Sequence, residues 1–227
     1  MPNSSPICAL ARLATVAVAV AGAAILPAAL VACGSGNTAP VDTIFATPIL
    51  TGYVVGGSQQ GTRTNDDIAV GDADANVPNS SLRGAMSFDL TQLPAGATVT
   101  SATLFTRECA VVGHPVPALG NVVLEHVNFG PVLDTAVYST PAIDTLGGVL
   151  TSDSTIGHRT RNVTAAVLAD IVAGRTTTQF LLVMSEFADS HDSANDYVVF
   201  QAPSGSYNTL CNPATRQGAQ LLISAHM

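Results

Sequence analysis

Apolar side chains follow a period of two between Leu82 and Leu90, and only an extended strand can bury such a pattern on one face. The apolar positions are Leu82, Met86, Phe88 and Leu90, with Arg83, Ser87 and Asp89 between them. Leu93-Pro94-Ala95-Gly96 then supplies a turn, because proline fixes φ and glycine tolerates a positive φ. The β-branched residues of Thr98–Thr106 resume a strand. The sequence therefore predicts a β-hairpin here.

Most of the remaining chain repeats this pattern of short strands separated by Asn, Gly, Pro and Asp. Such a series is typical of an antiparallel sandwich. One segment differs: Thr164–Gly174 has high helix propensity, a threonine that can cap its start and a glycine at its end. Val163, Val167 and Ile171 are expected to face the sheet. The expected strands are Ile49–Val55, Asp67–Val70, Leu82–Leu90, Thr98–Arg107, Asn121–Phe129, Thr155–Arg161, Thr178–Ser185, Tyr197–Gln201 and Gln220–Ser224.

The N-terminal region has the pattern of a secretory leader. Leu13–Leu30 is uncharged and apolar and follows a single Arg12. The ending Leu-Val-Ala-Cys33-Gly resembles the lipobox of bacterial lipoproteins, which implies cleavage before Cys33 and acylation of its thiol and amine. The alternative is a plain N-terminal membrane anchor, since 18 apolar residues nearly span a bilayer. Pro27 and the small residues before the cysteine favour the lipoprotein.

This interpretation divides the chain into a signal peptide (1–32), a lipidated cysteine with a flexible tether (33–44) and one β-sandwich domain (45–227). The chain contains 16 acidic residues and 8 basic ones, all of them arginine, and its formal net charge is −8. Loss of Arg12 with the leader makes the charge one unit more negative. Such a surface repels nucleic acid and anionic headgroups, so we expect membrane attachment through the lipid anchor only.

Two cysteines remain after the leader and Cys33 are set aside. In an oxidising compartment Cys109 and Cys211 are expected to form a disulfide, the alternative being two buried thiols. The bridge would close a loop of about 100 residues and add about 4–5 kcal/mol in the chain-entropy model.

The segment from Arg83 to Leu104 resembles a family motif. Its sequence, R-G-A-M-S-F-D-L-T-Q-L-P-A-G-A-T-V-T-S-A-T-L, is similar to the R-x-x-x-x-F-D-L-S-x-L-P-x-G-A-x-I-x-S-A-x-L segment of DNRLRE-type domains. These are secreted jelly-roll modules related to disaggregatase-type repeats and to a class of carbohydrate-binding modules. Weaker similarities follow in the family's order over Ala136–Pro141, Asn162–Val167, Gln179–Leu182, Val198–Phe200 and Gln220–Ile223.

The resemblance covers about Thr51 to Ser224 and departs from the family in its aromatic residues. Tyr138 stands where the family has tryptophan, Asn162 where it has aspartate, and the chain has no tryptophan. Tyr138 is expected to fill the core position of that tryptophan. The resemblance implies an antiparallel jelly-roll sandwich and a non-catalytic module.

Two acidic loops are candidates for a calcium site. Asp72-Ala-Asp74-Ala-Asn76 begins like a calcium loop, although Val77 and Arg83 exclude an EF-hand. The expected calcium ligands are Asp66, Asp67, Asp72 and Asp74, the alternative being a solvated polar loop. The second loop, Asp189–Asp196, would join the first if the fold brings them together.

No catalytic motif is present. Ser190, His191 and Asp192 are adjacent in sequence, where side chains generally point apart, and the chain has no G-x-S-x-G elbow. No two of the five histidines have metal-ligand spacing, so each is expected at the surface or half-buried. For a glycan, Tyr207 is the expected exposed aromatic platform, and Arg63 the leading arginine among Arg63, Arg83, Arg107, Arg159 and Arg161.

These observations favour a non-catalytic lipoprotein of the outer membrane or cell surface that binds a polysaccharide. The alternative is a structural or adhesion protein of the envelope or matrix with a protein partner. Sparse aromatic residues favour the alternative, whereas the family resemblance favours glycan binding.

Overall fold

The computed structural model describes residues 41–45, 47, 50–57, 60–64, 66–73, 80–186, 192–201, 211 and 218–227. They belong to one compact unit. Cys33, Asp74 and Tyr207 lie outside the described residues, as does the first part of the second acidic loop, so their expected roles stay predictions. In the part of the chain that is described, no helix is long and apolar enough to cross a bilayer.

The domain is an all-β antiparallel sandwich, as expected. Its strands are β1 (Val41–Phe45), β2 (Gly52–Gly57), β3 (Gly61–Thr64), β4 (Ile68–Ala73), β5 (Ser80–Asp89), β6 (Thr98–Val112), β7 (Val122–Val127), β8 (Asp144–Thr151), β9 (Gly157–Asn162), β10 (Thr177–Met184), β11 (Asn195–Phe200) and β12 (Gln220–His226). The helices are α1 (Pro115–Leu119) and α2 (Thr164–Val172), with 3-10 turns η2 (Leu90–Gln92) and η3 (Thr135–Ser139).

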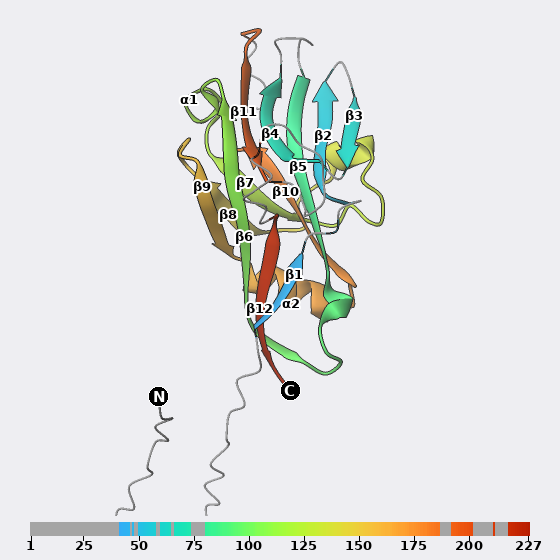
Figure 1. Ribbon diagram of the computed structural model, residues 1–227. Helices are drawn as coiled ribbons and strands as arrows, with labels where there is room; N and C mark the ends of the chain where they lie inside the picture. Colours follow the sequence, from blue (N-terminus) through green and yellow to red (C-terminus); the bar gives the residue numbers. More distant parts are fainter. Residues whose placement is uncertain are drawn as a thin grey trace, which may run out of the picture. The chain divides into compact units, whose positions relative to one another are not determined.

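The strands form two layers around a large apolar cluster (Figure 1). One layer has the order β1-β12-β6-β11-β4, with β9 on the other edge of β6. The second has the order β5-β10-β7-β8, with β2 and then β3 beyond β5. The layers join where β4 and β5 pair through Gly71↔Leu82 and Asp72↔Ser81.

The motif from Arg83 to Leu104 forms two strands but not the expected hairpin. Strand β5 pairs with β2, β4 and β10, whereas β6 pairs with β12, β11 and β9. The segment between them crosses from one layer to the other. Asp89 caps η2 by accepting the Thr91 N–H at 2.9 Å, and Leu93 packs on the core, which turns the chain across the sandwich.

Strand β6 runs the length of its layer and defines two ends. At the β1 end, Thr98 pairs with His226, Val41 pairs with Ser224, and α2 begins where the Val163 N–H bonds the Ala102 carbonyl at 2.9 Å. At the α1 end, Val112 lies opposite Tyr197, next to the start of α1. Figure 1 shows α1 and α2 at these opposite ends.

The expected domain boundary at residue 45 is too late. Strand β1 begins at Val41 and pairs with β12 over its whole length. Residues 41–44 therefore belong to the fold and not to the expected tether.

Helix α2 is present as expected, but its buried face differs from the expected one. Val163 and Val167 are buried, whereas Ile171 is 38% exposed and Asp170 takes the inward position. The cap also differs: Asn162 Oδ1 accepts the Thr164 N–H at 3.0 Å, and the Thr164 hydroxyl bonds Ala102 instead. Gly174, at φ 71°, ends the helix as expected.

Candidate functional site

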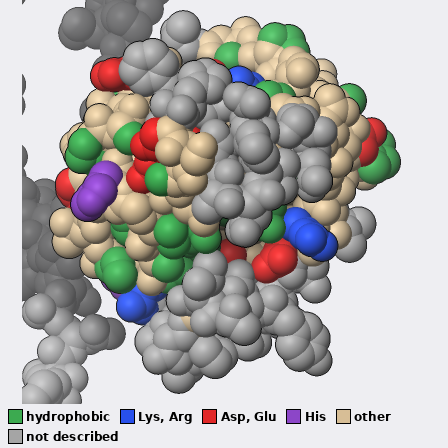
Figure 2. Space-filling view, turned by 90° about the horizontal axis from the view of Figure 1, so that it is seen from above, with side chains coloured by type: hydrophobic (Ala, Val, Ile, Leu, Met, Phe, Trp, Pro, Cys, Tyr) green, Lys and Arg blue, Asp and Glu red, His purple; other side chains and the backbone are tan. Residues whose placement is uncertain are grey.

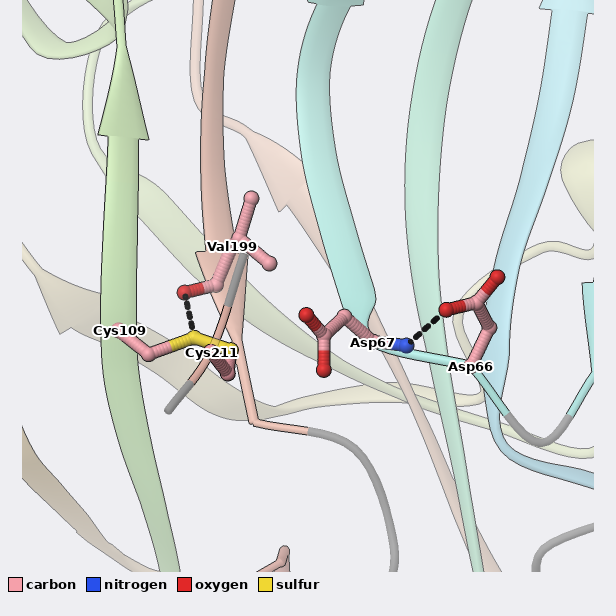
Figure 3. The surroundings of a disulfide bond; sticks show 5 residues. All are labelled: Asp66, Asp67, Cys109, Val199 and Cys211. Atoms are coloured by element: carbon pink, nitrogen blue, oxygen red, sulfur yellow. Dashed lines mark hydrogen bonds between the residues drawn. A yellow bond between two sulfur atoms is a disulfide. The ribbon is translucent and has the colours of Figure 1, made fainter. Parts of the chain in front are cut away.

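We call the Asp66–Asp67 pair, just before β4, the corner, because the expected disulfide lies on one side of it and Arg63 on the other. The Asp67 N–H donates to Asp66 Oδ1 at 2.8 Å, and the two carboxylates point in different directions (Figure 3). Asp67 is buried beside the cysteines, whereas Asp66 is half-buried. The two aspartates therefore have different surroundings.

The inward side of this corner is the disulfide. Cys109 of β6 and Cys211 are joined, with Cα atoms 5.3 Å apart, as expected from the sequence. Cys109 Sγ lies 3.4 Å from the Val199 carbonyl oxygen (Figure 3). Ligand atoms of Asp67 and both cysteines lie within 4.8 Å of one another. Because both sulfurs are bonded to each other, we assign no metal to this cluster.

The outward side of the corner brings together Tyr53, Arg63 and Asp66. Tyr53 of β2 lies directly opposite Arg63 of β3. Burial raises the pKa of the Tyr53 phenol, the nearby Asp66 carboxylate raises it further, and Arg63 opposes both. This cluster combines an aromatic ring, a guanidinium and a carboxylate on adjacent segments.

Arg63 differs from the other four candidate arginines because its side chain is exposed. Arg83 Nη1 donates to the Tyr138 carbonyl at 2.8 Å and lies 4.6 Å from the centre of its ring. Arg159 pairs with Glu108 and Asp153, and Arg161 Nε donates to the Gly147 carbonyl at 2.8 Å. Arg63 is therefore the arginine best placed to meet a ligand.

Tyr138 is partly buried and packs against the second, smaller apolar cluster, as expected from the sequence. Its hydroxyl bonds the Ser81 hydroxyl, and its ring occupies the space where a side chain on Gly56 would lie. Tyr138 is therefore a core residue that fastens η3 to β2 and β5.

Asp67 and Asp72, two of the aspartates expected to share one calcium ion, do not converge. Asp67 and Asp72 lie at opposite ends of β4, so their Cα atoms are about 16 Å apart at about 3.3 Å per residue. Calcium–oxygen bonds are only about 2.3–2.6 Å long. One ion cannot contact both residues, and the expected set must be divided.

The fold instead brings one aspartate of each acidic segment, Asp72 and Asp196, together at the α1 end. Asp72 of β4 lies directly opposite Asp196 of β11, and both are buried, with exposed fractions of 0% and 4%. Asp196 Oδ1 accepts the His114 N–H, and it lies where a side chain on Gly113 would have to fit. Figure 2 looks onto this end and shows exposed carboxylates on it.

A buried histidine has no counterpart among the residues expected from the sequence. His126 of β7 is fully buried, against the expectation of a surface or half-buried residue. Its Nδ1 lies 2.8 Å from Asp144 Oδ2 on β8, and its Nε2 lies 2.9 Å from Asp170 Oδ2 on α2. Arg175 Nη1 lies 2.5 Å from Asp170 Oδ1. The partners are distant in sequence, so no local spacing could signal the network.

Hydrogen bonds decide the charge states of this network. Burial disfavours a charged imidazole, but hydrogen bonds to Asp170 and Asp144 outweigh it and raise the pKa of His126. Burial also disfavours the Asp170 carboxylate, but the hydrogen bonds with His126 and Arg175 outweigh it and lower the pKa of Asp170. An imidazolium between two carboxylates is a cross-brace between β7, β8 and α2.

The chain matches no protein-family model and no curated protein.

Proposed function

We propose that this protein is a non-catalytic, lipid-anchored module of the cell surface, with a jelly-roll sandwich of the DNRLRE type that binds polysaccharide. The observation that carries the proposal is the Tyr53–Arg63–Asp66 cluster. Arg63 donates several N–H groups toward sugar hydroxyls or carboxylates, Asp66 accepts from hydroxyls, and Tyr53 offers ring surface. The three residues come from adjacent segments of a rigid sandwich.

The anchor in this proposal is the acylated Cys33, which follows the apolar leader 1–32. It places the domain outside the cytoplasm, where the Cys109–Cys211 disulfide is stable. An intact-mass measurement of the protein purified from membranes tests the anchor. A mass equal to the chain from Cys33 plus acyl groups supports it, and an unprocessed chain contradicts it.

Calcium is part of the proposal, at Asp72 and Asp196 rather than at the set expected from the sequence. Two carboxylates supply the hard oxygen ligands that calcium prefers. Like charges in a buried cross-strand pair repel, and a bound cation offsets that repulsion. Calcium here would join β4 to β11 and order the α1 end.

The binding proposal is tested by retardation of residues 34–227 in gels cast with different polysaccharides, with calcium and with a chelator. We expect retardation by at least one glycan class. Arg63→Ala and Asp66→Asn should weaken it by about tenfold, as expected for the loss of one charge-assisted hydrogen bond. Thr64→Ala, at the exposed neighbouring position on β3, is the matched control.

Two outcomes contradict this proposal. Retardation that is equal in wild type and Arg63→Ala would remove the cluster from the binding site. Absence of retardation across a broad panel would favour the alternative, a structural or adhesion protein whose partner is another protein.

A further inference from the structure

Helix α2 carries apolar side chains on its outer face as well as on its buried face. Val172 is 87% exposed, and Leu168 and Ile171 are each 38% exposed. From Val163 to Gly174 the only charged residue is Asp170, which is buried and paired with His126 and Arg175. A helix that is apolar on all sides normally has a second surface to contact.

The surroundings of α2 are also poor in charge. The segment from Leu90 to Thr98, which joins the layers at the β1 end, contains no charged residue. It lies beside the residues that follow α2, because the Leu90 N–H donates to the Thr176 carbonyl at 2.9 Å. Met227, next to β12 at the same end, is 89% exposed. Asp42, Asp89 and Arg175 also lie at this end, so the uncharged surface is formed by the outer face of α2 and the segment from Leu90 to Thr98.

The chain enters the fold at this same end. Val41 pairs with Ser224, and the residue before Ser224, Ile223, lies opposite Ala102. The Ala102 carbonyl accepts the Val163 N–H at the start of α2. In Figure 1 the start of β1 and α2 lie together at the end opposite α1. The tether from Cys33 to Val41 spans at most about 28 Å when fully extended. Acyl chains on Cys33 would hold this end close to the bilayer.

We propose that the outer face of α2, formed by Leu168, Ile171 and Val172, docks on the lipid bilayer that holds the Cys33 anchor. The inference rests on the proposed lipoprotein anchor, and it replaces the expectation of membrane contact through the anchor only with a second, apolar contact. Contact is apolar, so the negative charge of the protein does not oppose it at this end. The short tether would keep α2 near the bilayer at a high effective concentration, so a weak apolar contact is enough for docking.

The absence of tryptophan from the chain makes a direct test possible. Val172→Trp introduces a single tryptophan at a position that is 87% exposed, where the fold tolerates it. The mature lipidated protein is reconstituted in phosphatidylcholine vesicles with or without bromine on the acyl chains. Because interfacial helices lie about 5–10 Å into the headgroup boundary, the emission of the Val172→Trp variant should fall by roughly half in brominated vesicles.

Ile156→Trp is the matched control. Ile156 is an apolar residue that is 54% exposed, and the neighbouring Gly157 lies opposite Glu108, about 20 Å along β6 from Ala102. Its emission should not change with bromination. Adding Leu168→Asp to the Val172→Trp variant should prevent the loss of emission in brominated vesicles, whereas adding Ile156→Asp should not. Thermal unfolding checks that both double variants fold.

The outcomes separate the anchor from the docking. A protein that does not float with vesicles contradicts the anchor and with it the docking. A Val172→Trp protein that floats but shows no bromine quenching contradicts docking alone. A blue shift of its emission that depends on protein concentration and not on bromination would show that another protein copy covers α2, and would also overturn the inference.

Discussion

Two buried carboxylates in this sandwich, Asp170 and Asp196, have neighbours of opposite charge. Asp170, near the β1 end, contacts His126 and Arg175. Asp196, at the α1 end, lies opposite Asp72, another carboxylate. Both are almost fully buried, at 0% and 4% exposed. Burial alone therefore does not distinguish these two carboxylates, whereas the charge of the neighbouring side chain does.

The His126 network alternates in charge: carboxylate, imidazolium, carboxylate and guanidinium. Such a group needs nothing from outside the chain. The Asp72–Asp196 pair has the same sign twice, which is the arrangement expected where a cation binds. The first is a brace, and the second is the proposed calcium site.

The largest expected effect is the loss of the brace. His126→Ala should lower the free energy of unfolding by about 3 kcal/mol or more, because it leaves Asp170 buried with one cationic partner fewer. Urea denaturation measures the change. His158→Ala, at an exposed histidine on β9, is the control and should change stability by about 0.5 kcal/mol. Equal effects of the two variants would show that the brace contributes nothing.

The brace also predicts how stability depends on pH. The pKa of His126 is raised in the folded protein, so the imidazole stabilises the fold. This contribution to the free energy of unfolding is complete below the unfolded pKa of about 6.5 and is lost as pH rises through the folded pKa. The pKa of Asp170 is lowered in the folded protein. The contribution of its carboxylate to the free energy of unfolding is present above the unfolded pKa of about 3.9 and is lost as pH falls through the folded pKa.

The melting temperature of wild type should therefore fall at alkaline pH more steeply than that of His126→Ala. Thermal unfolding of both proteins across this range measures the difference. Parallel curves above about pH 6.5 would contradict the charged imidazole.

Calcium should stabilise the protein through Asp72 and Asp196 and not through the His126 network. Saturating calcium should stabilise wild type by about 2–3 kcal/mol, the value expected at about 100 times the dissociation constant, and a chelator should reverse it. Asp196→Asn should abolish this increase, while it retains an oxygen for the His114 N–H. The same increase in Asp196→Asn would place any bound calcium elsewhere.

The smallest expected effect is at the edge of the brace. Arg175 is 28% exposed in its side chain, so solvent screens its contact with Asp170. Arg175→Ala should lower the free energy of unfolding by about 1 kcal/mol, less than His126→Ala. Urea denaturation of both variants gives the order. An equal or larger loss in Arg175→Ala would mean that the guanidinium, and not the imidazolium, balances Asp170.

Much of the fold was predictable because its signals are local. Each strand expected from alternation and turn residues is present, as is the helix from Thr164. The missed strands have weak local signals. Strand β3 is four polar or small residues, and β8 contains Gly147 and Gly148, where its register against β7 shifts. Strand β1 is identified only by its pairing with β12, at the other end of the chain.

The candidate sites were less predictable because they depend on which strands become neighbours. Asp66 and Asp72 are close in sequence but separated by the length of β4. Asp72 and Asp196 are far apart in sequence and directly opposite in the ladder. The disulfide was predictable because only two cysteines remained to pair. His126 was not, since neither of its carboxylate partners is a sequence neighbour.

The pairing of β1 with β12 has a mechanical consequence under the proposed anchorage. The tether enters at Val41, and β1 runs from there along β12 toward Phe45. A pull from the membrane therefore acts along the strand axis, while the hydrogen bonds of an antiparallel pair lie perpendicular to it. The bonds share the load in shear instead of opening one after another. The pairing of β1 with β12 should therefore resist separation when the anchored end of the chain is pulled.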